Sequence, residues 1–567
     1  MEEIIKKVAS ELNIAIKQVE NTLKLLEEGN TVPFIARYRK EMTHNLNEEE
    51  IDYIQKEYTY LVNLNKRKED VMRLIETQGK LTDEIKESII NAQKLNELED
   101  IYRPYRQKRK TRATEAVRKG LKPLSEYMLA LNRSGDIYEE AKKYLSEEVT
   151  SVDEALKGAK DIIAEIVSDD ANNRQKIRSS LENYSTIVTK EKKEHKDEKK
   201  VYELYYDHHE KFKYIEAHRV MAIERAVNEK VITKTFEYDK EYLVNYAYNA
   251  LTKKRHFVGE ELVMEAVRDG LERLAFPSVE NEVWGTVLKK AQDKSIEVFA
   301  TNLEKLLLQP PLKKSCIMGF DPAFRTGCKL AILDSTGKLL HIDKIYPHAP
   351  VNKYKEAEKK FVSLVKEYKV ETVAIGNGTA SRESERFVAE VIQNNDLDLQ
   401  YTIVSEAGAS VYSASENARK EFPDLQVEER SAVSIARRLL DPLSELIKID
   451  PKSIGVGQYQ HDLPPKQLEE SLDFAILKSV NRVGVDVNTA SVELLTHVSG
   501  MNKGIAESLV KYRNENGNFH KREELKKVNK LGNKVYEQAS GFLRIKDGDE
   551  ILDSTSIHPE SYKLAKA

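Results

Sequence analysis

Two acidic residues stand where a nuclease would hold metal ions. Asp321 ends the apolar run CIMGF, and Glu406 ends the run YTIVS. Two divalent metals clamp the attacking and leaving oxygens of a phosphodiester only where several carboxylates converge from different strands and a helix. The stretch that should supply the helical carboxylate, RSAVSIARRLL, carries Ser431 and Ser434 in its inward half instead.

A degenerate site is the favoured interpretation of these residues. Mg²⁺ gives up its water reluctantly and depends on carboxylate charge, and the end of the intervening strand offers Asn377 rather than an acid. We expect Asp321 and Glu406 to be vestigial, Asp321 to pair with Arg325 in the turn DPAFRTG, and no metal or cofactor to be bound. The alternative is an active, metal-dependent nuclease specific for branched structures that uses both carboxylates.

A second group of residues has the pattern of a phosphate-binding site. The stretch LTHVSGMNKGIAESLV (495–510) returns thirty residues later as LKKVNKLGNKVYEQAS (525–540), which predicts two helix-hairpin-helix units. Small residues in each turn let backbone amides approach a phosphate, and the dipole of the next helix favours the anion. A pair of structural hairpins with glycine corners is the alternative. The predicted contacts are Gly500, Asn502, Lys503, Gly504, Lys530, Gly532, Asn533 and Lys534.

A third group is the basic segment IYRPYRQKRKTRA (101–113), in which Tyr102 and Tyr105 stand between cationic side chains. Cations with nearby aromatic rings can follow a phosphate backbone and stack on unpaired bases. A solvated basic loop with inward-packed tyrosines fits equally well. The basic residues are Arg103, Arg106, Lys108, Arg109, Lys110 and Arg112.

Helices make up most of the first half of the chain. Apolar residues recur at helical spacing up to residue 305, as in Ile162, Ile163, Ile166 and Val167, so we expect helix almost throughout this region. The charged stretch KEKKEHKDEKK (190–200) has no apolar side and predicts a solvated helix or a connector.

A different domain follows Pro310 and Pro311, because proline stops a helix. Three apolar runs separated by tight turns, CIMGFD, KLAILD and LLHIDKIYP, predict an antiparallel meander. This order of elements is that of a ribonuclease H-like fold, although other α/β folds share parts of it. The elements expected after the meander alternate helix and strand before the final helices: 354–368, 371–378, 381–395, 400–408, 413–420 and 429–447.

Composition restricts the class of protein. A chain of 567 residues with 33% charged and 40% apolar residues is typical of a multidomain globular protein. No apolar run is long enough to span a membrane, and two cysteines suggest a reducing cytoplasm. The net charge of −4 means that any surface for nucleic acid must be a local patch.

Several long stretches of the sequence resemble the Tex family of bacterial transcription accessory proteins. The most specific are NTVPFIARYRKEMT (30–43), LEDIYRPYRQKRKTRA (98–113), GFDPAFRTGCKLAILD (319–334), AIGNGTASRESE (374–385), SEAGASVYSASENA (405–418) and DPKSIGVGQYQHD (450–462).

The resemblance implies an elongated, mainly helical multidomain scaffold with one α/β domain of the YqgF type, which is ribonuclease H-like, and tandem helix-hairpin-helix modules. It also implies binding to DNA or RNA without strong sequence preference. A further alternative for the function is an interaction protein whose main ligand is RNA polymerase or the ribosome. Family members usually end in an OB-fold RNA-binding domain, whereas this chain stops at Ala567. The segment EAHRVMAIERAVNE (216–229) departs from the usual family pattern.

These observations lead to one expected organisation and function. We expect a cytoplasmic, non-catalytic, nucleic-acid-binding protein of transcription that does not associate with membranes. The expected domains are a helical N-terminal region with a helix-turn-helix-like part (1–308), a ribonuclease H-like domain (315–450), a linker and helix (451–482), the tandem hairpins (483–547), and a boundary or the start of a truncated C-terminal region (548–567).

Overall fold

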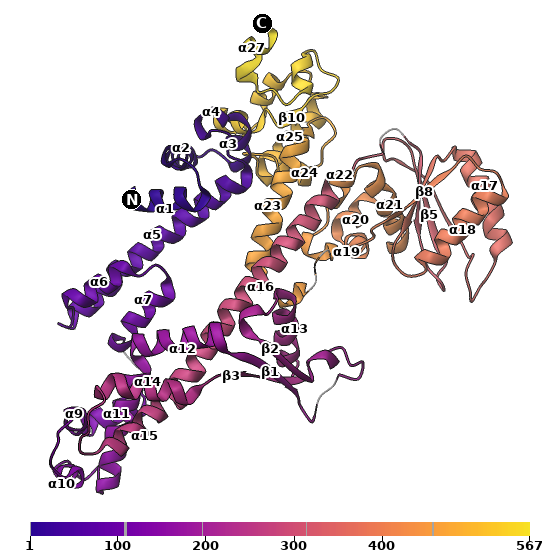
Figure 1. Cartoon of the computed structure of the whole chain (residues 1–567). Helices are drawn as coiled ribbons and strands as arrows, with labels where there is room; N and C mark the ends of the chain where they lie inside the picture. Colours follow the sequence, from indigo (N-terminus) through magenta and orange to yellow (C-terminus); the bar gives the residue numbers. More distant parts are fainter. Residues whose placement is uncertain (1, 107–109, 195–196, 313–314, 456, 458) are drawn as a thin grey trace. The chain divides into compact units, whose positions relative to one another are not determined.

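The computed structural model describes residues 2–106, 110–194, 197–312, 315–455, 457 and 459–567 (Figure 1). The chain forms two compact units, one of residues 58–294 and one that combines residues 2–57 with residues 295–567. Two long helices, α5 (Glu48–Thr77) and α16 (Phe276–Leu307), pass from one unit into the other.

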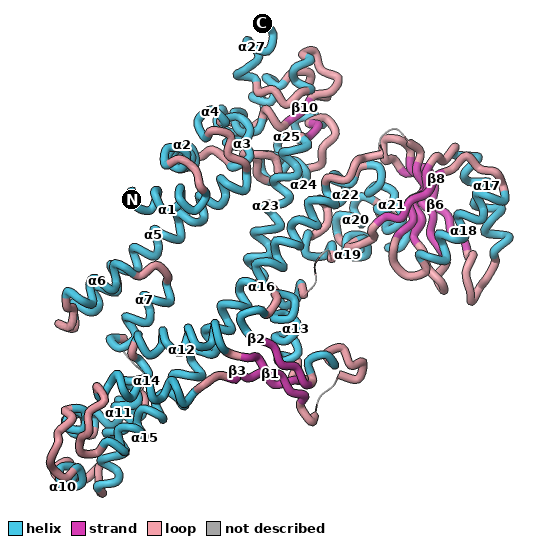
Figure 2. Tube along the Cα trace, viewed as in Figure 1, coloured by secondary structure: helices cyan, strands magenta, loops and turns pink. Residues whose placement is uncertain are grey.

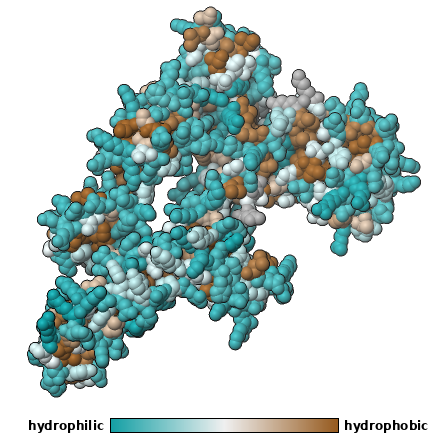
Figure 3. Space-filling model, viewed as in Figure 1, coloured by the Kyte–Doolittle hydropathy of each residue, from teal (hydrophilic) through white to brown (hydrophobic). Residues whose placement is uncertain are grey.

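The surface is mainly hydrophilic on the face that Figure 3 shows, where apolar residues (brown) form small separate groups among polar ones (teal). In the described residues, no helix is both long enough and apolar enough to cross a bilayer.

The unit of residues 58–294 is helical around α11 (Val152–Asp169). Three of the four apolar residues predicted to face its core are buried, and only Ile166 is 47% exposed. Gly270 lets the chain pass close to α11, because a Cβ there would overlap the carbonyl oxygen of Ala164. The other helices are α6 (Asp83–Asn91), α7 (Leu95–Tyr102), α8 (Arg112–Arg118), α9 (Lys122–Leu129), α10 (Ile137–Lys142), α12 (Ala171–Tyr184), α13 (Ala217–Asn228), α14 (Lys240–Thr252) and α15 (Glu260–Asp269).

The same unit contains a small antiparallel sheet, so the prediction of helix almost throughout is wrong here. Its strands are β1 (Thr186–Glu191), β2 (Asp207–Lys211) and β3 (Ile232–Glu237), in the order β2-β1-β3, and Figure 2 shows them in magenta. The central strand buries Ile187 and Val188. The charged stretch 190–200 is not a helix in its described part: its first two residues finish β1, and bends and turns follow.

The second unit contains the predicted ribonuclease H-like sheet, in the order β6-β5-β4-β7-β8. The three strands of the meander pair antiparallel, and β7 and β8 run parallel to β4. The prediction of strand order and helix positions is therefore confirmed. The strands are β4 (Ile317–Asp321), β5 (Cys328–Leu333), β6 (Leu339–Ile345), β7 (Thr372–Gly376) and β8 (Gln400–Val404).

Helices cover both faces of this sheet (Figure 1). On one face α17 (Tyr354–Tyr368) and α18 (Ser381–Asn394) close an apolar core. On the other face α21 (Val427–Leu440) packs so closely on β4 that a Cβ on Gly319 would overlap the carbonyl oxygen of Ala432. Shorter helices complete this part: α19 (Ala409–Ala414), α20 (Glu416–Glu421) and α22 (Pro442–Leu446).

The tandem hairpins follow α23 (Pro465–Val483). They consist of α24 (Val492–Thr496), α25 (Lys503–Asn516), a 3-10 helix (Arg522–Lys527) and α26 (Asn533–Ala539), and the two-residue strands β9 (Val485–Asp486) and β10 (Leu543–Arg544) close them into one body. The N-terminal helices of this unit are α1 (Glu2–Leu12), α2 (Ile16–Glu27), α3 (Val32–Tyr38) and α4 (Lys40–Thr43).

Part of the last twenty residues packs against the hairpins. Asp553 and His558 are buried, and the guanidinium of the buried Arg522 donates to the carbonyl oxygens of Ile557 at 2.7 Å and Thr555 at 2.6 Å. A short helix, α27 (Tyr562–Lys566), follows. Residues 548–562 thus belong to the hairpin body.

Candidate nucleic-acid interface

The two hairpin turns have the same backbone geometry. Gly500 and Lys530, thirty residues apart, both adopt left-handed conformations, with φ of +77° and +67°. The N–H of Met501 donates to the carbonyl of Val498 at 2.9 Å, and the equivalent bond in the second turn is 3.2 Å long. The internal repeat seen in the sequence is therefore also a structural repeat.

The first turn leaves backbone donors available at the start of α25. Asn502 caps this helix, and its side-chain oxygen accepts from the N–H of Ile505 at 3.0 Å. Within the described residues, the N–H groups of Lys503 and Gly504 have no hydrogen-bond acceptor. Free amides at the N-terminus of a fourteen-residue helix attract an anion, because the helix dipole adds to their own partial charge.

The second turn contributes a cation to the same place. The ammonium of Lys530 lies 3.7 Å from the position that a Cβ on Gly504 would take. Lys503 and Lys530 are both exposed. The structure thus brings Lys503, Gly504 and Lys530 together at one helix N-terminus, although they come from different hairpins.

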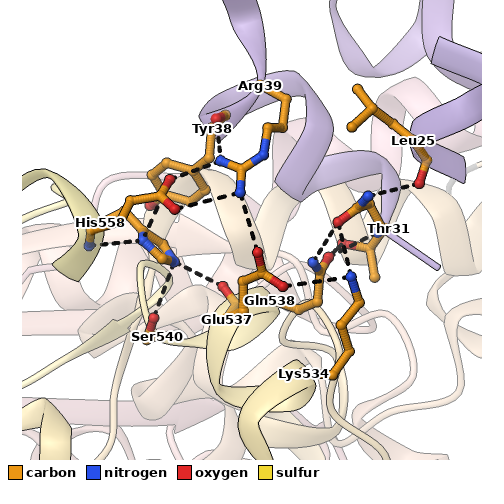
Figure 4. A network of polar contacts seen from close by, with 11 residues as sticks. Leu25, Thr31, Tyr38, Arg39, Lys534, Glu537, Gln538, Ser540 and His558 are labelled. Atoms are coloured by element: carbon orange, nitrogen blue, oxygen red, sulfur yellow. Dashed lines mark hydrogen bonds and ion pairs between the residues drawn. The ribbon is translucent and has the colours of Figure 1, made fainter. Parts of the chain in front are cut away.

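Lys534 and its neighbour Gln538 face the N-terminal segment instead (Figure 4). The Lys534 ammonium donates to Asn30 Oδ1 at 3.2 Å and lies 3.5 Å from Glu537. The side-chain amide of Gln538 donates to the same oxygen at 2.9 Å and accepts from the N–H of Thr31 at 2.9 Å. Lys534 therefore has intramolecular partners, which Lys503 and Lys530 lack in the described part of the chain.

The segment after Asn30 anchors itself on the hairpin body through aromatic and charged contacts (Figure 4). The Tyr38 ring centroid lies 5.0 Å from that of His558, and its hydroxyl donates to the carbonyl of Ser556 at 2.8 Å. Arg39 pairs with Glu560 at 2.8 Å. A Cβ on Gly541 would overlap the Tyr38 hydroxyl. Sequence reasoning missed this interface, for which the stretch 30–43 was the available signal.

The basic segment 101–112 is largely engaged within its own unit. Tyr102 is buried, and Arg106 pairs with Glu99 and lies 5.6 Å from the centre of the Tyr102 ring. Burial is the main cause that lowers the pKa of Arg103, and repulsion from the charge of Arg174 lowers this pKa further. Lys108 and Arg109 lie outside the described residues, whereas Lys110 and Arg112 are exposed. Tyr102 therefore packs inward, as the alternative of a solvated basic loop with inward-packed tyrosines predicts.

The nuclease-like cleft brings Asp321 and Glu406 into one site. Burial and the charge of Glu406 raise the pKa of Asp321 to about 6, and a hydrogen bond from Ser431 opposes this shift. Glu428, which sequence reasoning did not consider, adds further negative charge from the first turn of α21. Both Asp321 and Arg325 are described, and they form no ion pair, so the predicted pairing is wrong. The residue opposite Asp321 on β5 is Lys329.

Glu406 is held by the backbone of the loop after β7. A Cβ on Gly376 or Gly378 would overlap its carboxylate, so both glycines are required for this approach. The N–H of Gly378 donates to the carboxylate, and the N–H of Glu406 donates to Asn377 Oδ1 at 3.0 Å. Burial raises the pKa of Glu406, and the charge of Arg438 lowers it.

The cleft does not fit the two metals that its fold implies. Among the described residues, no group of three or more His, Cys, Asp and Glu side chains is arranged to hold a metal. Ser434, on α21, is 1% exposed. Its hydroxyl and two nitrogens of the buried Arg438 have no hydrogen-bond partner in the described part of the chain.

Comparison with known proteins identifies the same modules. Relatives that match nearly the whole chain include Protein YdcI of Bacillus subtilis, 51% identical over 99% of this chain and 79% of its own length. The Transcriptional accessory protein Tex of Neisseria gonorrhoeae is 42% identical over 99% of this chain and 74% of its own length. The S1 RNA-binding domain-containing protein 1 of Homo sapiens is 34% identical over 96% of this chain and 56% of its own length. The matching family models are a Tex-like protein N-terminal domain (2–76), a Tex central region-like segment (132–299), a Tex protein YqgF-like domain (315–440) and a helix-hairpin-helix motif (480–544).

These matches follow the regions described above in order along the chain. With three Tex models on one chain and relatives more than 40% identical over almost its full length, the chain belongs to the Tex family.

Proposed function

We propose that this protein is a cytoplasmic transcription accessory protein that binds nucleic acid through the phosphate backbone and does not cleave it. The observation that carries the proposal is the approach of Lys530 from the second hairpin to the free amides of Lys503 and Gly504 in the first. The name of the Neisseria relative supports a role in transcription, and the name of the human relative supports RNA as a ligand.

The arrangement favours phosphate over base recognition. Helix N-terminal amides and lysine side chains contact phosphate oxygens, which are the same in every sequence. Binding of this kind releases counterions, so the affinity should fall steeply as salt rises. We expect single- and double-stranded DNA and RNA of different sequences to bind with similar affinity at one salt concentration.

Charge reversal at the convergent lysines tests the proposal. The double substitution K503E/K530E should weaken binding to all sequences and reduce the salt slope, by roughly one for each phosphate that is no longer neutralised. Lys511, exposed on the same helix at 3.9 Å from Glu515, provides the matched control K511E. If K503E/K530E and K511E bind alike, the hairpins are structural corners and the proposed site is wrong.

The non-cleaving part of the proposal has its own test. The protein should leave branched and single-stranded substrates intact in Mg²⁺ or Mn²⁺, because Asp321, Glu406 and Glu428 are not arranged as a metal-binding group in the described part of the chain. Cleavage that disappears in D321N would support the metal-dependent nuclease instead.

A partner in the transcription or translation machinery is a second proposal. The Neisseria relative's name places that protein in transcription, and RNA polymerase and the ribosome are the candidates. Capture of either complex by the full chain, retained after nuclease treatment, would support direct protein contact. Loss of capture after nuclease treatment would mean that nucleic acid forms the bridge.

A further inference from the structure

A lysine stands directly across from the nuclease-like aspartate. In the antiparallel pairing of β4 and β5, Asp321 faces Lys329. Residues directly opposite on neighbouring strands project to the same face of a sheet, and this is the face covered by α21. Lys329 is only 3% exposed, and its ammonium donates to the hydroxyl of Thr326 at 2.8 Å and the carbonyl of the same residue at 3.2 Å.

A buried arginine stands beneath the second carboxylate. The guanidinium of Arg438, also 3% exposed, donates to the carbonyl oxygens of Ser405 at 2.7 Å and Ala407 at 2.8 Å. These are the residues on either side of Glu406, and the charge of Arg438 favours the ionised form of that carboxylate. Two of its nitrogens are buried without a hydrogen-bond partner in the described residues.

A buried, incompletely bonded cation is costly, so its presence needs a compensating charge. Glu445, 2% exposed, also attracts Arg438 and in turn pairs with Lys448 at 3.0 Å. The carboxylates Asp321, Glu406 and Glu445 thus have the cations Lys329, Arg438 and Lys448 near them, while Glu428 adds one further negative charge. The chain itself therefore offsets much of the negative charge of the cleft.

We propose that Lys329 and Arg438 take the electrostatic place of the two metal ions of a ribonuclease H-like site, so that the cleft is stable and closed to divalent cations. The missing third carboxylate is then not the only reason why the cleft does not bind metal. Adding an acid on α21 is not sufficient to restore metal binding while Lys329 is present. This inference deepens the non-cleaving part of the proposed function, and its test involves no nucleic acid.

Binding of Mn²⁺, followed by electron paramagnetic resonance and calorimetry, tests the inference on the full chain. Ser431 already contacts Asp321, so S431D supplies the third carboxylate. Wild type should not bind Mn²⁺ in this domain and S431D should bind it only weakly, whereas S431D/K329M should bind it at least about tenfold more tightly than S431D, because one nearby positive charge is removed. S431D/K338M, which removes an exposed lysine of the β5–β6 turn, is the control and should behave as S431D.

Three results of this experiment would overturn the inference. They are Mn²⁺ binding by wild type that D321N abolishes, binding by S431D as tight as that of S431D/K329M, and no binding by a folded S431D/K329M.

Thermal unfolding in EDTA at pH 8 keeps the inference testable if the combined variant folds poorly. K329M should lower the melting temperature more when Asp321 is present than in the D321N variant. In D321N, Lys329 has no carboxylate at position 321 to compensate, so its loss should matter less. Equal shifts in the two backgrounds would show that Lys329 and Asp321 are uncoupled, which contradicts the proposal.

Discussion

Replacement of Gln538 by leucine should detach the N-terminal segment from the hairpins. Gln538 is 2% exposed and joins three parts of the fold. Its amide bonds to Asn30 and Thr31, and its Cβ lies 2.6 Å from the place that a Cβ on Gly500 would occupy. Leucine keeps the packing against the first turn but removes these hydrogen bonds and the longer one, 3.3 Å, that the Thr31 hydroxyl donates to Gln538.

The cost of Q538L can be worked out from these hydrogen bonds. Each of the two 2.9 Å bonds contributes about 0.5–1.5 kcal/mol net. The N–H of Thr31 then loses its acceptor in a partly buried position, which adds about 1–3 kcal/mol. Asn30 Oδ1 keeps its bond from Lys534 and adds little. We therefore expect a total loss of about 2–6 kcal/mol.

Hydrogen exchange measured by mass spectrometry is the appropriate assay, since it reports the opening of one segment in the full chain. A loss of about 2–6 kcal/mol corresponds to exchange roughly 30- to 25,000-fold faster in residues 30–39. Affinity for nucleic acid should also fall, because the first turn loses its support. Q393L, at an exposed position of α18, is the control. Unchanged exchange in residues 30–39 of Q538L would refute the reasoning.

Other parts of the fold give four further predictions. K530G should raise the free energy of unfolding by about 1 kcal/mol, since glycine accepts a left-handed φ, and yet weaken nucleic-acid binding; unfolding and binding isotherms check the opposite signs. G541A should lower the free energy of unfolding by about 1–3 kcal/mol, because the new methyl group clashes with Tyr38. Y38F should not relieve the clash, since the phenylalanine ring occupies the same position as the tyrosine ring, and the melting temperatures of the single and double variants test this expectation. R522M should cost about 3–5 kcal/mol and expose residues 548–567 to protease, since four carbonyl groups lose the hydrogen bond from the guanidinium. Asp321, with its pKa raised to about 6, contributes stability that is present below pH 4 and lost as pH rises through 6; wild type should therefore lose up to about 3 kcal/mol relative to D321N between pH 4 and 7, and parallel unfolding curves of the two proteins would contradict this.

The ribonuclease H-like sheet could be predicted from the sequence because each of its signals is local. Prolines at 310 and 311 end the preceding helix, and tight turns separate the strands of the meander. The small sheet of residues 186–237 was not predicted, because its local signal is weak. Its run TIVT (186–189) is short and lies between a long helix and a highly charged stretch, which masks its β-branched character.

The interface between residues 30–39 and the hairpins could not be predicted in this way. Asn30 and Gln538 are 508 residues apart in sequence, and no periodic pattern specifies which distant surface a helix covers. The hairpin repeat was visible, but it could not show that Lys534 faces Asn30 whereas Lys530 faces Gly504. Equivalent positions of a repeat acquire different partners because their surroundings differ.

The charge balance of the cleft lies between these two cases. The pairing of β4 with β5 places Lys329 opposite Asp321; the predicted antiparallel meander implies that these strands pair but does not give their register. A lysine within an otherwise apolar strand is a signal in itself, because a buried ammonium requires a partner. Arg438 carries no such signal, since its neighbours Glu406 and Glu445 meet only after α21 packs on the sheet. Whether a nuclease-like aspartate can bind metal is therefore better inferred from the cation that strand pairing places opposite it than from the acids that are missing elsewhere.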